Sequence, residues 1–167
     1  MASKLTRLLR ELVLWLSIGV AVSIAVDYFR QPALPQNFSA TALQTLDGEP
    51  VDLAAMSRDR PLLVYVWATW CAVCRYTTPA VATLAAEGGN VMSVALRSGD
   101  NAMLKKWLAK KKMTLPTVND ASGELARQWD VQVTPTLVVI SHGEVKSITT
   151  GWTSTWGMRL RLWLASW

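Results

Sequence analysis

The two cysteines of the chain, Cys71 and Cys74, stand two residues apart in the sequence WATWCAVC (67–74). A disulfide across so short a loop removes little conformational entropy from the unfolded chain, so it is a poor stabilising crosslink. A structural zinc site needs about four ligands, and the chain offers only these two thiols and His142. Two thiolates can hold copper(I), but no cluster of methionines or histidines accompanies them. The spacing therefore favours a redox-active pair without a resident metal, and copper(I) binding stays open as an alternative.

A helix is predicted to begin at Cys71 and to run to about Ala86, after an apolar segment. At the start of a helix, a sulfur atom faces free backbone N–H groups and the positive end of the helix dipole. Both stabilise a thiolate and lower the thiol pKa below its usual value of about 8.5. We therefore expect Cys71 to be the attacking thiol, and Cys74, one turn along and less exposed, to resolve the mixed disulfide. Trp70 is expected to flank the exposed sulfur of Cys71, with Trp67 in the core beneath it.

Segments with strand and helix patterns alternate after residue 37. Strands are predicted at 62–68, 91–96, 115–118, 136–140 and 145–150, and helices at 71–86, 100–112, 121–129 and from near 154 onward. The turn dipeptide Asp47-Gly48 indicates an earlier hairpin over 38–56. This order predicts an α/β fold, with a central mixed β-sheet flanked by helices and an N-terminal β-hairpin. Active residues of such sheets lie where a strand ends and a helix begins, which is the position of Cys71.

The composition is more apolar than that of a typical soluble domain, since 51% of the residues are hydrophobic and 17% are charged. Part of the excess is the uncharged run at 12–26, which follows three basic residues. As a helix this run spans roughly 22 Å, less than the ~30 Å of a membrane core, and extension to 8–29 closes the gap. The charge order predicts a single-pass transmembrane signal anchor with a cytoplasmic N-terminus. A cleaved signal peptide is the alternative, and both place the domain outside the cytoplasmic membrane, where disulfides persist.

Three parts of the chain are predicted from these patterns. Residues 1–29 are the cytoplasmic tip and the transmembrane helix, 30–37 are an extended linker with two prolines, and 38–167 are the catalytic domain. The formal net charge is +5, and the first thirty residues carry +2 of it, as four basic against two acidic residues. The remaining charge of about +3 is too small to indicate a nucleic-acid surface, so we expect no nucleic-acid partner.

Two further features concern the surface of the domain. Five lysines between 105 and 112 are interpreted as the solvated face of a helix, with docking to an acidic partner or to anionic lipid as the alternative. Four tryptophans lie between 152 and 167, and most of them are expected to pack the last helix on the sheet.

The order Trp-Ala-Thr-Trp-Cys-x-x-Cys-Arg after an apolar strand, with Pro79 in the following helix and Thr134-Pro135 further on, resembles the thioredoxin superfamily. The segments at 38–56 and 133–145 look like its TlpA-like branch, which contains membrane-anchored periplasmic thiol-disulfide oxidoreductases. Within that branch, the motif is most similar to the suppressor-of-copper-sensitivity D proteins. The resemblance covers about residues 38–165 and implies a thioredoxin-like fold with a TlpA-like insertion.

The resemblance also implies roles for individual residues. Cys71 matches the nucleophile of the superfamily and Cys74 its resolving thiol, while Pro135 matches a proline that follows a cis peptide bond. The backbone of Thr134 is then expected to pair with a passing substrate strand. The other residues expected on the substrate-binding surface are Trp70, Ala72 and Val73.

One position departs from the superfamily pattern. Thioredoxins usually carry a buried aspartate two residues before the first tryptophan of the motif, and this chain has Tyr65 there. Asp100 and Glu124 are candidate proton acceptors, although each is also interpreted as a helix cap or a surface residue. The sequence therefore leaves the proton acceptor open.

The residues between the cysteines, Ala72 and Val73, are uncharged, so they add no cationic donor that would strongly stabilise a thiolate. We expect a mild pair that acts as a reductant without a cofactor and receives electrons from a membrane donor. The resemblance implies disulfide-containing periplasmic proteins as partners, linked to copper stress or to cytochrome assembly. A disulfide oxidant, a copper-handling thiol protein and an interaction module with incidental cysteines are the alternatives.

Overall fold

The computed structural model describes residues 2–30, 32–35 and 37–167, and the chain divides into two compact units. The first unit is the helix α1 (Ala2–Arg30), and the second is a domain that extends from Pro32 to Trp167. Large apolar side chains of α1 are exposed to solvent, and they are Leu8, Leu9, Leu12, Val13, Leu14, Trp15, Leu16, Ile18 and Val22.

The transmembrane helix expected over 8–29 is not found. Among the residues that the structure describes, no helix is both long enough and apolar enough to cross a membrane.

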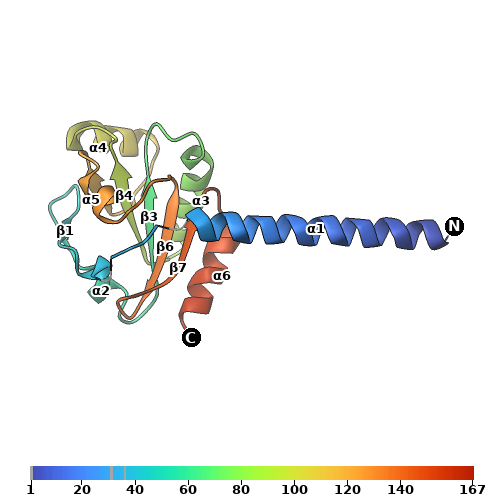
Figure 1. Cartoon of the computed structure of the whole chain (residues 1–167). Coiled ribbons are helices and arrows are strands. Elements are labelled where there is room, and N and C mark those ends of the chain that lie inside the picture. Colours follow the sequence, from blue (N-terminus) through green and yellow to red (C-terminus); the bar gives the residue numbers. More distant parts are fainter. Residues whose placement is uncertain (1, 31, 36) are drawn as a thin grey trace. The chain divides into compact units, whose positions relative to one another are not determined.

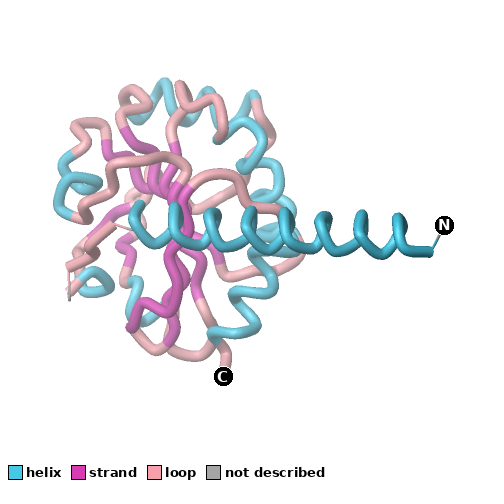
Figure 2. The backbone as a smooth tube through the Cα atoms, turned by 45° about the vertical axis from the view of Figure 1, so that its right-hand side comes forward, coloured by secondary structure: helices cyan, strands magenta, loops and turns pink. Residues whose placement is uncertain are grey.

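The domain is built on a five-stranded mixed sheet with the strand order β5-β4-β3-β6-β7 (Figure 1). Its strands are β3 (Leu62–Trp67), β4 (Val91–Leu96), β5 (Thr117–Asp120), β6 (Thr136–Ser141) and β7 (Glu144–Thr150). β3 pairs in parallel with β4 and antiparallel with β6, so it forms the centre of the sheet. The strands run through the middle of the domain with helices on either side (Figure 2), as the α/β pattern of the sequence predicts.

Every residue of β3 is buried, because helices cover both faces of the sheet. Successive side chains of a strand point to opposite faces. Tyr65 and Trp67 therefore enter one apolar core, while Val64 and Val66 enter the other. An uninterrupted apolar run suits a strand that is buried on two sides, and it makes β3 a rigid base for the residues that follow it.

Three helices contribute to the core around Trp67, and they are α3 (Cys74–Ala86), α4 (Asn101–Lys110) and α6 (Thr155–Ala165). Short elements contribute to the opposite core, and they are η1 (Phe38–Ala40), α2 (Leu53–Met56) and α5 (Glu124–Gln128). Side chains of neighbouring helices meet on the first face, where Arg159 of α6 forms an ion pair with Glu87 at the end of α3.

The predicted start of the helix over 71–86 was wrong by three residues. The N–H of Cys71 donates to the carbonyl of Ala68 at 3.2 Å and closes a turn over residues 68–71, and α3 begins only at Cys74. The predicted end near Ala86 is confirmed. The cysteine pair therefore bridges the turn and the first helical residue.

Two other helices begin where a carboxylate accepts their first N–H groups. The side chain of Asp100 accepts from the N–H of Met103 at 2.8 Å, which confirms the start predicted for α4. The buried carboxylate of Asp120 accepts from the N–H groups of Leu125 and Ala126, at 3.2 and 2.8 Å. α5 is consequently shorter than the segment 121–129 that the sequence favoured.

The expected hairpin is present as β1 (Leu43–Gln44) and β2 (Pro50–Val51), with Gly48 at a positive φ of 88° in the turn. It lies beside the edge strand β5, because the N–H of Leu46 donates to the carbonyl of Thr117 at 2.8 Å. β5 itself begins at 117 rather than at 115.

The expectation that most C-terminal tryptophans pack on the sheet was wrong. The exposed ones are Trp152, Trp156, Trp163 and Trp167. The sheet-facing side of α6 is instead formed by smaller or unbranched side chains, since Met158 is buried and Leu162 and Ala165 pack against the core.

Candidate active site

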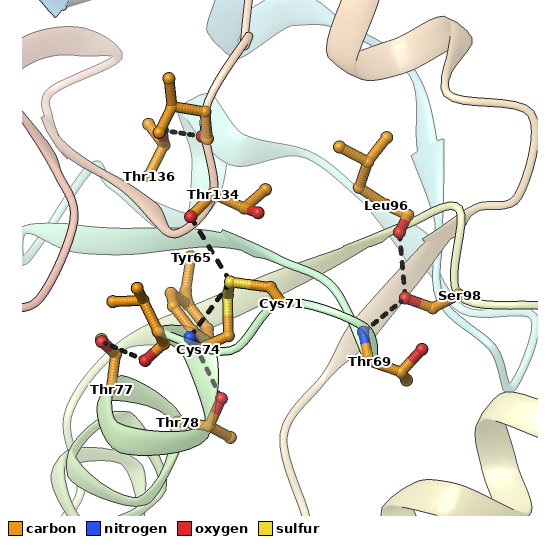
Figure 3. Close-up of a disulfide and its surroundings, with 12 residues drawn as sticks. Tyr65, Thr69, Cys71, Cys74, Thr77, Thr78, Leu96, Ser98, Thr134 and Thr136 are labelled. Carbon is orange, nitrogen blue, oxygen red and sulfur yellow. Dashed lines mark hydrogen bonds between the residues drawn. A yellow bond between two sulfur atoms is a disulfide. The ribbon is translucent and has the colours of Figure 1, made fainter.

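Cys71 and Cys74 form a disulfide, with their Cα atoms 5.3 Å apart (Figure 3). Cys71 follows the turn after β3, and Cys74 is the first residue of α3. The hydroxyl of Ser98 fixes this turn, because it accepts from the N–H of Thr69 and donates to the carbonyl of Leu96, both at 3.0 Å. Ser98 follows β4, and the sequence interpretation did not include it. It ties the reactive turn to the neighbouring strand.

The sulfur of Cys71 has a donor on one side and an acceptor on the other (Figure 3). The N–H of Cys74 points to it at 3.1 Å, and the carbonyl oxygen of Thr134 lies 3.4 Å away. In the reduced protein, the N–H stabilises the thiolate, while the carbonyl accepts a hydrogen bond only from the protonated thiol. Because the N–H contact is shorter and belongs to a helix start, we expect the Cys71 thiolate to be more stable than the thiolate of a free cysteine.

Both sulfur-bearing residues are more enclosed than the sequence suggested. Cys71 has 6% of its surface exposed and Cys74 has 2%, so the expectation of an openly exposed Cys71 was wrong, although the ranking of the two was correct. The exposed neighbours are Trp70, Ala72 and Val73, as expected for residues of a substrate-binding surface. The indole N–H of Trp70 donates to the carbonyl of Arg97 at 3.1 Å and holds that ring beside the turn.

Thr134 and Pro135 lie beside the disulfide although they are more than sixty residues away in the sequence. The peptide bond between them is cis, as the resemblance implies. Pro135 is buried, its carbonyl accepts from the N–H of Gly151 at 2.8 Å, and the hydroxyl of Thr136 donates to the carbonyl of Val133 at 2.7 Å. These bonds fix the Thr134 carbonyl next to Cys71. The structure thus brings together the cysteines, Thr134 and Pro135.

Tyr65 occupies the position of the usual buried aspartate and is fully buried. Its hydroxyl forms a hydrogen bond of 2.8 Å with the hydroxyl of Thr78 on α3 (Figure 3). Burial raises the pKa of Tyr65 to about 12, and the bond to Thr78 opposes this only in part. Tyr65 therefore stays protonated near neutral pH and does not accept a proton from Cys74.

The two acids proposed as proton acceptors have other roles in the structure. Asp100 caps α4 through Met103. Glu124 is exposed and pairs with Arg127 at 2.6 Å, and the hydrogen bonds from Arg127 and Gln128 lower its pKa to about 2. Neither acid lines the cavity beside the disulfide.

That cavity has a volume of about 530 Å³ and opens on the Cys74 side of the disulfide, between α3 and the C-terminal end of α4. Its lining residues are Trp67, Ala68, Thr69, Cys71, Cys74, Arg75, Thr78, Pro79, Ala82, Trp107, Lys111 and Met113. The sequence interpretation assigned no site role to Arg75 or Trp107. In the sequence, Lys111 is only one member of a basic stretch. Its place in the cavity depends on how α3 and α4 pack, which local sequence does not show.

In the described part of the chain, no three histidine, cysteine, aspartate or glutamate residues cluster as possible metal ligands. His142 is exposed in the turn between β6 and β7, as the sequence indicated.

The fold and the paired thiols can be compared with known proteins. The family described as AhpC/TSA matches residues 34–148, which is more than half of the chain. The chain belongs to the AhpC/TSA family.

This AhpC/TSA family member is 44% identical over 163 residues to the "Thioredoxin-like protein" of Haemophilus influenzae, and the match covers 97% of each chain. It is 36% identical over 110 residues to the "Thiol:disulfide interchange protein DsbE" of Pseudomonas fluorescens, covering 62% of this chain and 61% of that one. Together with the Cys71–Cys74 disulfide, these relatives identify a thiol-disulfide oxidoreductase of the thioredoxin type.

Solved structures agree on the fold of this AhpC/TSA family member. A putative thioredoxin from Neisseria meningitidis superposes with a TM-score of 0.67 at 20% identity, covering 81% of this chain and 91% of that one. The exposed lipoprotein thioredoxin of Streptococcus pneumoniae gives a TM-score of 0.64 at 22% identity, covering 74% and 98%. The domain therefore has a thioredoxin-like fold, as the resemblance implied.

Proposed function

We propose that this thiol-disulfide oxidoreductase reduces disulfides of periplasmic proteins and is recharged by an electron donor in the membrane. The main support for this proposal is the environment of the Cys71 sulfur. Its hydrogen-bond-distance neighbours in the described chain are one backbone N–H and one carbonyl, so no cationic side chain bonds to it. A strongly oxidising pair needs a much more stabilised thiolate than one N–H group provides.

The reaction is an exchange of two electrons. The Cys71 thiolate attacks one sulfur of the substrate disulfide, forms a mixed disulfide and releases the first substrate thiolate. The Cys74 thiolate then attacks the Cys71 sulfur, which closes the Cys71–Cys74 disulfide and releases the second thiolate. The substrate is reduced and the enzyme is oxidised, so a dithiol donor must return two electrons before the next cycle.

The direction is tested by equilibrating the purified protein with glutathione buffers and measuring the fraction of Cys71–Cys74 disulfide. A reduction potential at or below about −200 mV supports the reductant. A value near about −120 mV would make the protein an oxidant and its membrane partner an electron acceptor.

The roles of the two cysteines are tested by single substitutions. Cys71→Ser should abolish exchange, because the attacking thiol is lost. Cys74→Ser should accumulate a mixed disulfide on Cys71, which is detectable as a substrate adduct on a non-reducing gel. If both variants exchange disulfides at the wild-type rate, the enzyme does not use this pair.

We also propose that the domain lies in the periplasm and that residues 1–29 attach it to the cytoplasmic membrane. The uncharged run at 12–26 and the basic residues before it support this, as do the exposed apolar side chains of α1. Cell fractionation with alkaline carbonate extraction tests the attachment, and a membrane-impermeant thiol reagent applied to intact spheroplasts tests the location. A reduced protein that the reagent cannot reach before lysis would contradict the periplasmic location.

The resemblance of the motif to the suppressor-of-copper-sensitivity D proteins supports a narrower proposal, in which the substrates are proteins linked to copper tolerance. A deletion strain should then lose growth on copper, and the wild-type gene but not its Cys71→Ser variant should restore it. If the metal itself is the cargo, the reduced protein should instead bind one equivalent of copper(I) in competition with a chelator.

A further inference from the structure

The cavity on the Cys74 side of the disulfide has an apolar floor and a cationic rim. Trp107, Pro79 and Met113 supply apolar surface, while Arg75 and Lys111 supply two positive charges. No aspartate or glutamate lies among the lining residues. A volume of about 530 Å³ is in the range of sites that hold small ligands or several side chains.

The two cations lack a carboxylate within the described part of the chain. The ion pairs found there involve other basic residues, so the guanidinium of Arg75 has no acidic partner. The ammonium of Lys111 lies 5.9 Å from the centre of the Trp107 ring, which holds it over the cavity wall without neutralising it. Both charges are therefore available to a ligand.

We propose that this cavity binds a carboxylate-bearing group next to the sulfur under attack, so that the enzyme prefers disulfides whose neighbouring residues are acidic and apolar. This inference rests on the proposed thiol-disulfide exchange and names its preferred substrates. Cys71 lines the cavity, so a substrate cysteine bonded to Cys71 can place its neighbouring residue there. The carboxylate then lies near Arg75 and Lys111, and apolar atoms contact Trp107.

Three small disulfides of similar size test the preference, because they differ mainly in charge: 3,3′-dithiodipropionate is anionic, hydroxyethyl disulfide is neutral and cystamine is cationic. The reduced full-length protein should react faster with the anionic disulfide than with the cationic one, relative to the uncatalysed thiol reaction of each. Added salt should reduce this ratio, because it screens charges near the surface. Disulfide-bonded peptides with aspartate or lysine beside the cysteine extend the same comparison to protein-like substrates.

Charge reversal at the rim identifies the residues responsible. Arg75→Glu and Lys111→Glu should each lower the ratio of anionic to cationic rates by roughly 3- to 5-fold, which corresponds to about 0.6–1 kcal/mol, the upper range for an exposed charge pair. Lys106→Glu is the matched control, because Lys106 is exposed on α4, carries the same charge and does not line the cavity. Its ratio should stay at the wild-type value.

The outcomes separate this inference from the proposed function. If the wild-type enzyme exchanges all three disulfides without a charge preference, or if Lys106→Glu changes the ratio as much as Lys111→Glu, the cavity does not select carboxylates. If no disulfide reacts, the proposed exchange activity itself fails. A loss of preference in the two rim variants alone supports the site.

Discussion

The hydrogen bond between Tyr65 and Thr78 makes a quantitative prediction about the position where thioredoxins carry an aspartate. Tyr65→Phe removes one hydroxyl and leaves that of Thr78 buried next to the ring. A buried polar group that loses its partner costs about 1–3 kcal/mol. We expect urea denaturation of the oxidised protein at pH 7 to show a loss of this size, and Thr78→Val to show a similar one.

The double variant Tyr65→Phe/Thr78→Val refines the prediction. It removes both hydroxyl groups, so no polar atom is left without its partner, and its loss should be smaller than the sum of the two single losses by about 1–2 kcal/mol. Strictly additive losses would show that the two hydroxyl groups do not depend on each other.

The raised pKa of Tyr65 predicts a further loss of stability at alkaline pH. The pKa is 10.0 for a free side chain and about 12 in the fold, so the folded protein holds this proton more tightly. The stabilisation is complete below pH 10 and is lost as the pH rises toward 12, at about 1.4 kcal/mol for each unit. The free energy of unfolding should thus fall by about 1.4 kcal/mol from this source by pH 11.

Two comparisons decide whether this reasoning is correct. Tyr65→Phe should lack the alkaline loss, whereas Tyr76→Phe should keep it, because Tyr76 is an exposed residue of α3. The pH profile of disulfide exchange between pH 6 and 9 should be unchanged in Tyr65→Phe. A shifted profile would refute the assignment, since Tyr65 would then take part in proton transfer.

Three further predictions concern other contacts of the domain. The pKa of the Cys71 thiol in the reduced protein should lie below the free value of about 8.5, because the N–H of Cys74 donates to the thiolate; thiolate absorbance measured against Cys71→Ser checks this, and a value above about 8.5 would contradict it. Asp120→Ala should lower the free energy of unfolding by about 1–2 kcal/mol, because the start of α5 loses its acceptor; an unchanged urea midpoint would remove the capping role. Arg159→Ala should cost less than about 1 kcal/mol, because its ion pair with Glu87 is partly exposed to solvent, and this cost should disappear in high salt.

Local sequence was sufficient for the elements that depend on one continuous pattern. The apolar run of β3 is buried on both faces and therefore reads as a central strand without further information. Asp100 and Ser154 each cap the helix that directly follows them in the sequence, so the starts of α4 and α6 could be predicted. The resemblance added what no local pattern contains, namely the cis bond before Pro135 and its position beside Cys71.

The features that were missed or misjudged depend on contacts between distant segments. Ser98 fixes the turn after β3 from the end of β4, and Lys111 reaches the cavity only because α4 packs against the same face as α3. The enclosure of Cys71 comes in part from the Thr134 carbonyl. The transmembrane expectation depends on length and hydropathy together, and among the described residues no helix is both long enough and apolar enough to cross a membrane.

The two residues between the cysteines can be replaced with little effect on the stability of the domain. The side chains of Ala72 and Val73 are exposed, and the helix start uses only their backbone carbonyls. That of Ala72 accepts from the N–H of Arg75 at 3.3 Å, and that of Val73 accepts from the N–H groups of Tyr76 and Thr77 at 3.1 and 3.3 Å. Substitutions there change the surroundings of the sulfur atoms without removing a core contact. Natural drift or a laboratory library can therefore retune the redox potential of the pair while the scaffold keeps its stability, and proteins with the same fold can diverge in electron flow through two residues.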